Sequence, residues 1–211
     1  MPNWCYSKYA FFTNDEDKSE LARLHKNLVD IIKTQSQKKN DFEPGWLGKV
    51  AMKHGFDWEQ ISCRGYIEEL GEYEPGDSYF TLSGETAWGP TDDLWEAVIE
   101  QYKGISFVYV AEEPGNGVYI NTDTDGVYFT DRFLMDIYGD VPIPEGWYPN
   151  QEKPVALEIH EYFDSFEDLN EYCTHLTGKS FDTLEKLSDY FNEVFADEGD
   201  VIFGIHEYTA A

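Results

Sequence analysis

The pattern of apolar and polar residues predicts a strand and two helices in the first part of the chain. An aromatic-rich run over 4–12, followed by the polar residues 13–15, is typical of a strand that leads into a helix N-cap. A helix is then predicted from four apolar residues at three- to four-residue spacing: Leu21, Leu24, Leu28 and Ile31. A short helical piece over 46–54 follows, and Gly55 ends it.

The next elements complete a recognisable order. Two β-prone runs over 63–73 and 78–88 flank a turn signal at 74–77, which predicts an antiparallel pair. A helix that begins at Pro90 and an apolar strand over 105–110 come next. The order β-α-β-β-α-β predicts an α+β protein with a ferredoxin-like antiparallel sheet and two helices on one face.

The composition changes over 141–154, where prolines and a glycine cluster, and this predicts a linker. Before it, strands over 118–121 and 127–133 are expected to form an extra hairpin, so the ferredoxin-like domain is expected to cover residues 1–140. After it we expect a βααβ segment over 155–211. Its predicted elements lie at 155–162, 166–176, 183–195 and 201–208.

Charge and cysteine usage narrow the class of protein. Residues 1–64 hold 10 basic and 9 acidic side chains, whereas residues 65–211 hold 5 and 33, for a net charge of −27. Such a surface repels phosphate backbones, so we expect no direct nucleic-acid binding. No apolar run approaches the length of a membrane helix and no signal peptide is evident, which predicts a cytoplasmic protein without membrane contact. Three cysteines without a C-x-x-C pair indicate reduced core thiols: Cys5, Cys63 and Cys173.

Three stretches carry a resemblance to a known family: Met1-Pro2-Asn3-Trp4-Cys5, Glu85-Thr86-Ala87-Trp88-Gly89-Pro90 and Glu112-Glu113-Pro114-Gly115. They resemble the YubB-like, or Api-type, family of phage and plasmid proteins over residues 1–135. The resemblance implies a ferredoxin-like domain from a mobile element, and that family offers no established activity to carry over. Read physically, the motif residues are predicted strand ends, turns and core anchors: Pro2, Asn3, Trp4, Cys5, Trp88, Gly89, Pro90, Glu113, Pro114 and Gly115.

Two patterns suggest metal chemistry. The tetrapeptide Ile-His-Glu-Tyr occurs twice, and if its two strands are neighbours it gives a candidate zinc or iron site from His160, Glu161, His206 and Glu207. The competing interpretation is that these side chains simply point outward. The run Asn121-x-Asp123-x-Asp125-Gly126 resembles half a calcium loop, but Arg132 stands where that loop needs a bidentate glutamate, which favours a hairpin turn.

Apart from these metal patterns, few residues suggest catalysis. Pro2 would be an N-terminal amine after removal of Met1 and could act as a general base, although only Lys8 lies close enough in sequence to keep it neutral. We therefore expect no cofactor and a non-enzymatic protein-interaction module, with an exposed aromatic or apolar patch bordered by acidic residues. The alternatives are an acidic DNA mimic that inhibits a restriction or other DNA-binding protein, and a metal-dependent or proline-based enzyme.

Overall fold

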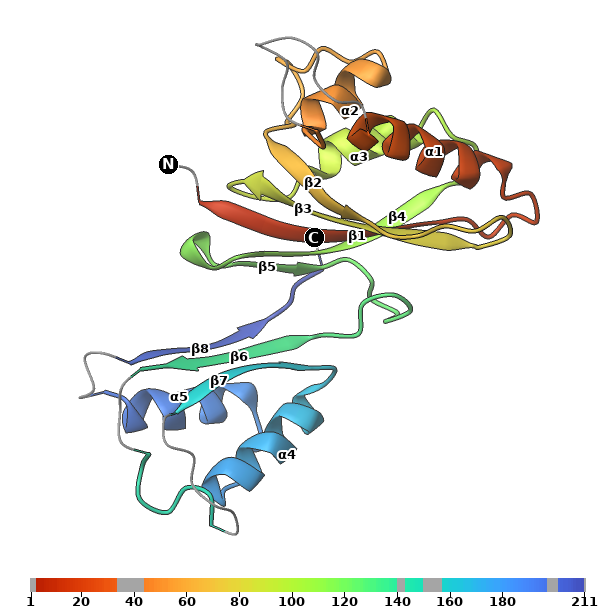
Figure 1. Cartoon of the computed structure of the whole chain (residues 1–211). Coiled ribbons are helices and arrows are strands. Elements are labelled where there is room, and N and C mark those ends of the chain that lie inside the picture. The colour runs from red at the N-terminus through yellow and green to blue at the C-terminus, as the bar shows by residue number, and fades with distance from the viewer. Residues whose placement is uncertain (1–2, 34–43, 140–142, 150–156, 197–200, 211) are drawn as a thin grey trace. The chain divides into compact units, whose positions relative to one another are not determined.

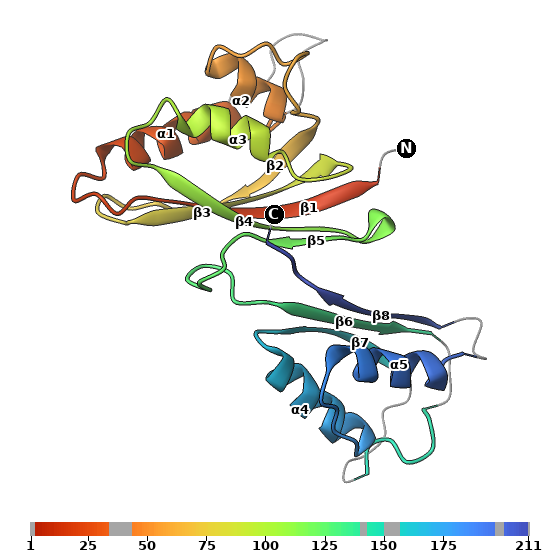
Figure 2. The ribbon, with the colours of Figure 1, turned by 180° about the vertical axis from the view of Figure 1, so that it is seen from behind.

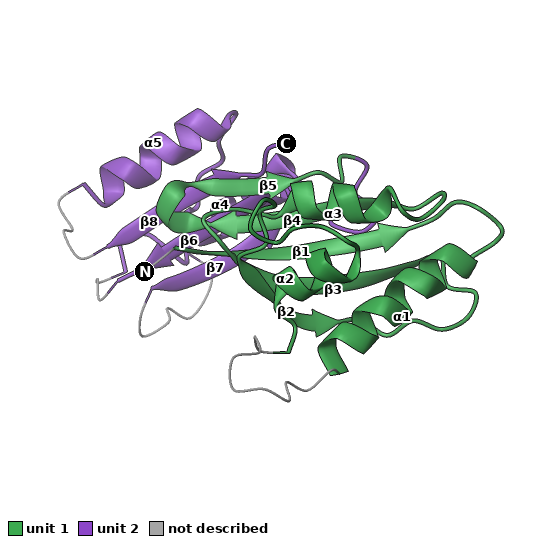
Figure 3. Cartoon of the chain, turned by 90° about the horizontal axis from the view of Figure 1, so that it is seen from above, with its two compact units in different colours: residues 1–124, 211 green, residues 125–210 purple. Residues whose placement is uncertain are grey.

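The chain forms two compact units, which Figure 3 shows in separate colours. The computed structural model describes residues 3–33, 44–139, 143–149, 157–196 and 201–210. Unit 1 comprises residues 1–124 and unit 2 residues 125–210. Each combines helices with an antiparallel sheet, which confirms the predicted α+β class. Over the described ranges, no helix is both long enough and apolar enough to cross a membrane.

Unit 1 is a five-stranded antiparallel sheet with its helices on one face (Figures 1 and 2). Its elements in chain order are β1 (Trp4–Phe12), α1 (Ser19–Lys33), α2 (Leu47–Lys53), β2 (Gly65–Leu70), β3 (Tyr79–Ala87), α3 (Asp92–Ile99), β4 (Ser106–Glu113), a 3₁₀ turn (Pro114–Asn116) and β5 (Val118–Asn121). The strands lie in the order β2-β3-β1-β4-β5, so β1 is central and pairs with β3 and β4.

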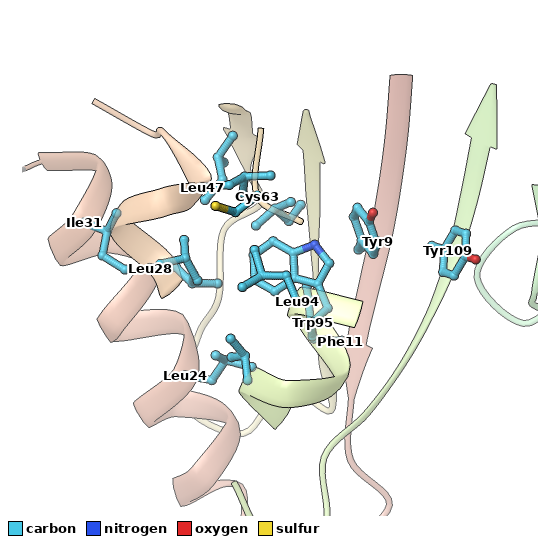
Figure 4. Packing of buried hydrophobic residues seen from close by; sticks show 14 of the residues in the cluster. Tyr9, Phe11, Leu24, Leu28, Ile31, Leu47, Cys63, Leu94, Trp95 and Tyr109 are labelled. Atoms are coloured by element: carbon cyan, nitrogen blue, oxygen red, sulfur yellow. The ribbon is translucent and has the colours of Figure 1, made fainter. Parts of the chain in front are cut away.

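The core of unit 1 lies between the sheet and the helices. Alternation along β1 directs Cys5, Ser7, Tyr9 and Phe11 to the buried face. Trp95 of α3 packs edge-on against Phe11, with ring centroids 5.1 Å apart (Figure 4). All four apolar positions predicted for the first helix are buried, which confirms its orientation.

Unit 2 is a three-stranded antiparallel sheet with two helices on one face (Figure 1). Its elements are β6 (Phe133–Tyr138), β7 (Glu158–Phe163), α4 (Phe166–Thr177), α5 (Leu184–Val194) and β8 (Ile202–Glu207). The strand order is β7-β6-β8, with β6 at the centre. The hydroxyls of Ser165 and Thr183 accept hydrogen bonds from backbone N–H groups and so cap the starts of α4 and α5.

The expected hairpin of 118–121 with 127–133 is wrong. β5 is present but pairs with β4, and residues 127–132 form no strand. β6 begins only at Phe133 and pairs with β7 and β8. The physical reason is burial: Phe133, Met135 and Ile137 face the core of unit 2, whereas Val127 is 69% exposed.

The division between the units falls after Thr124, which is earlier than the proline-rich stretch 141–154 from which the sequence analysis placed it. The described part of that stretch, 143–149, packs into unit 2 instead of linking two domains. Trp147 is buried, its ring lies 5.4 Å from that of Phe191, and its indole N–H donates to the Tyr190 hydroxyl. A buried indole with a satisfied N–H belongs to a core.

Candidate functional site

Three stretches that are distant in sequence meet at one end of the sheet of unit 1. Asn3 precedes β1, Trp88 follows β3 and Gly115 follows β4. The Trp88 N–H donates to the Asn3 carbonyl at 2.9 Å. A Cβ added to Gly115 would collide with the Asn3 side-chain amide, so these two residues approach closely. We call this region the motif end. Pro2 lies outside the described residues.

Trp88 has an unusual backbone conformation. Its φ of +74° lies in the left-handed region, which costs an L-residue about 1–2 kcal/mol relative to right-handed backbone. The side chain is nevertheless 53% exposed, so burial of the indole does not explain the strain. Strained residues that a structure retains are concentrated at functional sites.

Two further aromatic side chains are exposed on β1, where Trp4 lies across from Ala87, the residue before Trp88. Trp4 and Tyr6 are 43% and 44% exposed and share the face of β1 opposite the helices. Tyr6 lies directly across from Glu85 on β3 and from Glu112 on β4. We call Trp4, Tyr6 and Trp88 the aromatic patch. Carboxylates thus border it on both neighbouring strands.

Beneath the motif end, the helix-facing side of β1 is polar. The Cys5 thiol lies 3.6 Å from the Ser7 hydroxyl, and the Thr86 hydroxyl donates to the carbonyls of Gly89 (2.6 Å) and Cys5 (3.4 Å). Glu113 is only 2% exposed and accepts a 2.9 Å hydrogen bond from the Gly115 N–H. The Thr86 hydroxyl thus ties the end of β3 to β1, and Glu113 stabilises the turn that follows β4.

This buried polar group is poorly suited to nucleophilic chemistry. Burial raises the pKa of the Cys5 thiol, and the charge of Glu113 raises it further. A thiolate is the reactive form, so Cys5 stays unreactive near neutral pH. The second carboxylate oxygen of Glu113, Oε2, has no hydrogen-bond partner within the described residues. The sequence identified Glu113 as part of a turn but gave no sign of its burial.

The structure separates the four residues of the candidate metal site. His160 on β7 and His206 on β8 lie on either side of β6, across from Asp136 and Leu134. Glu161 and Glu207 alternate onto the opposite face of the sheet. Within the described ranges, no three His, Cys, Asp or Glu side chains gather in a way that could hold a metal.

The two histidines flank Asp136 instead. His160 Nδ1 lies 2.5 Å from Asp136 Oδ1, and its Nε2 lies 3.2 Å from the Tyr162 hydroxyl. The Tyr138 hydroxyl donates to Asp136 Oδ1 at 3.3 Å. On β8, the other neighbour of β6, burial lowers the pKa of His206, while the charge of Asp136 opposes that shift.

Sequence reasoning missed Asp136, although a signal for it exists. It is the one acidic residue in the apolar run Phe133–Tyr138, and a carboxylate in such a run needs a polar partner.

The calcium-like run is a turn in the structure. The Asn121 side-chain oxygen accepts from the Asp123 N–H at 2.9 Å, and Gly126 takes a left-handed φ of +67°. This hydrogen bond is the local pattern by which Asn starts a turn.

No protein-family model, curated protein or solved structure matches this chain. The resemblance to the YubB-like family therefore stays a prediction. The three resembling stretches meet at the motif end.

The aromatic patch differs from the other exposed aromatics in one respect. The rings of Trp4, Tyr6 and Trp88 make no hydrogen bond or ring contact with another described residue. Tyr138 and Tyr162 are also exposed, but their hydroxyls are engaged by Asp136 and His160. What the motif end can offer a partner is therefore unengaged aromatic surface.

Proposed function

We propose that the chain is a non-enzymatic protein-interaction module that contacts its partner through the aromatic patch. The observation that carries this proposal is the exposed, strained Trp88 beside the exposed rings of Trp4 and Tyr6. Trp and Tyr contribute disproportionately to binding free energy at protein interfaces. The raised pKa of Cys5 supports a role in binding over one in catalysis.

The border of the patch indicates the charge of the partner. Glu85 and Glu112 flank Tyr6 on adjacent strands, and unit 1 carries more acidic than basic residues. Complementary charge at an interface rim speeds association and selects partners. The partner surface is therefore expected to be an apolar centre with basic residues around it.

A ferredoxin-like fold for unit 1 is part of the same proposal. The order β2-β3-β1-β4, with α1 and α2 between β1 and β2 and α3 between β3 and β4, supports it, and β5 is then an added edge strand. The mobile-element origin rests on the resemblance of the three stretches at the motif end. A partner from a phage, a plasmid or their host follows from that origin.

The test compares partners captured by three forms of the full chain. The wild type and Trp4→Ala/Trp88→Ala are immobilised alongside a control, Tyr79→Ala/Met52→Ala, which removes two exposed side chains elsewhere on unit 1. We expect one defined protein to bind the wild type and the control, with its purified form losing at least tenfold in affinity for the patch variant. Equal binding to all three forms would refute the patch as the interface.

The alternative of a DNA mimic has one observation in its favour. Asp92 and Glu96 lie four residues apart on α3, and Glu100 follows at the same interval as its C-cap, which places successive carboxylates about 6 Å apart along the helix axis. A mimic has to compete for basic grooves. Excess protein added to restriction digests should then slow cleavage, and digests that run at the normal rate with every enzyme tried would remove this alternative.

A further inference from the structure

A groove between α3 and β4 has features that the aromatic patch lacks. It has a volume of about 390 Å³, and its walls come from α3, from β4 and from Thr122, which follows β5. Asp92 and Glu96 line the helix side, while Phe107 and Tyr109 line the strand side. An acidic wall thus faces an aromatic wall.

The carboxylates of the groove lack cationic partners. The Tyr109 hydroxyl donates to Asp92 at 3.4 Å, and the negative charges of Asp92 and Glu96 add to burial in raising the pKa of Tyr109. The hydrogen bond places Asp92 beside this hydroxyl, and Glu96 lies about one helical turn further along α3. No ion pair involves either of them within the described residues. Their charge is available to a cation from outside.

The strand side of the groove includes a short stretch of open sheet edge at Phe107. β5 pairs with β4 only from Val110 to Glu113, and Thr122 holds the Tyr109 N–H and C=O through three hydrogen bonds, which places both groups on the side away from β1 and already satisfies them. Alternate residues of an antiparallel strand direct these groups to the same side, so those of Phe107 point to the open edge as well. An extended segment can add to such an edge through backbone hydrogen bonds.

We propose that this groove binds an arginine-bearing extended segment of a protein partner, with the guanidinium between the two carboxylates and the aromatic wall. A guanidinium is planar, donates to two carboxylates at once and stacks on aromatic rings. Unit 1 already contains such an arrangement: Arg23 lies over the Tyr102 ring, 4.0 Å from its centroid, and pairs with Glu20. The proposal is independent of the aromatic patch and of the function proposed for it.

The experiment uses the full chain and a capped heptapeptide, Thr-Val-Arg-Val-Arg-Val-Thr, in isothermal titration. Sibling peptides carry lysine or citrulline in place of arginine, and citrulline keeps the shape of arginine without its charge. Asp92→Asn/Glu96→Gln is compared with Asp93→Asn/Glu59→Gln, which removes the same charge from exposed positions outside the groove. Melting curves check that both variants fold.

We expect the arginine peptide to bind the wild type and the charge control equally, and the groove variant to bind at least tenfold more weakly. The lysine peptide should be weaker than the arginine peptide, and the citrulline peptide weaker still. Amide NMR shifts should move at Ser106, Phe107 and Tyr109. The Trp4→Ala/Trp88→Ala variant should bind the peptide like the wild type, which separates this proposal from the aromatic patch.

Three outcomes would overturn the proposal: equal binding of the citrulline peptide, equal losses in the groove variant and the charge control, or full displacement of the peptide by equimolar spermidine. The last two would mean that the peptide responds only to overall negative charge. Such attraction would also weaken uniformly with added salt.

Discussion

The two units expose similar side chains and use them differently. At the motif end of unit 1, the rings of Trp4, Tyr6 and Trp88 make no hydrogen bond or ring contact with a described residue, while the polar groups beneath them are buried and hydrogen-bonded to the backbone. On the outer face of the sheet of unit 2, the exposed Tyr138 and Tyr162 hydrogen-bond to the Asp136–His160 pair. Exposure is therefore common to both units, whereas exposed rings without a hydrogen bond or ring contact among the described residues are found at the motif end, which is why we propose the interface there.

The largest effect on stability should come from deleting one buried ring from the core of each unit. Trp95→Ala in unit 1 and Phe191→Ala in unit 2 each remove a fully buried ring and should each lower the unfolding free energy of their own unit by about 3–5 kcal/mol. Hydrogen exchange measured residue by residue would show whether protection falls in one unit only. Loss of protection throughout the chain in both variants would mean that the units unfold together.

A smaller loss of stability is expected from changes to Glu113, the buried carboxylate of the motif end. Glu113→Ala deletes the acceptor for the Gly115 N–H and should cost about 1–3 kcal/mol. Glu113→Gln keeps an oxygen for that bond and should cost less. Urea unfolding of the two variants measures the difference. If Glu113→Gln is the more damaging change, the charge of Glu113, not its hydrogen bond, is what the motif end needs.

The strain at Trp88 can be measured by a difference between two variants. Trp88→Gly and Trp88→Ala both remove the indole, but only glycine accepts a φ of +74° without cost. The glycine variant should therefore be more stable than the alanine variant by about 1 kcal/mol. Both should lose the partner of the aromatic patch. Equal stability of the two variants would show that the backbone is unstrained there.

The smallest effect is a pH dependence that both units share. Burial lowers the pKa of His54 in unit 1 and of His206 in unit 2, so the folded state keeps both imidazoles neutral to a lower pH than the unfolded chain does. Below the ordinary histidine pKa of about 6.5 the unfolded chain binds more protons than the folded chain, and stability falls as the pH falls towards the folded-state pKa.

NMR titration of the histidine ring protons can separate the two units. Asp136→Asn should lower the pKa of His206 further, because it removes the opposing charge, and should leave His54 unchanged. Urea unfolding at pH 7.5 and at pH 5.5 checks the loss of stability. A His206 pKa that does not respond to Asp136→Asn would show that the charge of Asp136 does not act on His206.

Features that depend on a local sequence pattern could be predicted, whereas features that depend on long-range strand pairing could not. The strand 4–12 and the apolar stripe of α1 were predicted correctly because each depends on a period within one element. β6 was misplaced because its partners β7 and β8 lie far along the chain. The convergence of the three motif stretches depends on strand register, and the left-handed Trp88 depends on where β3 ends.

The candidate metal site shows the same limit: the sequence revealed the repeated motif but not how its strands pair. The repeated Ile-His-Glu-Tyr does lie on the two strands that flank β6, but a strand stands between them and alternation turns the glutamates away from the histidines. Asp136 completes the arrangement that the histidines actually form. A spacing in sequence could suggest the histidines but could not supply their neighbour.

In both units the central strand precedes its neighbours along the chain, and this shapes synthesis on the ribosome. β1 can pair only after β3 and β4 have been synthesised. β6 can pair only after β7 and β8 have been synthesised, and β8 ends at Glu207. Each nascent sheet therefore begins as a strand with two unpaired edges, the state most exposed to pairing with other chains. β6 is the more apolar of the two, so nascent chains that end between β6 and β8 are where we expect chaperones to bind.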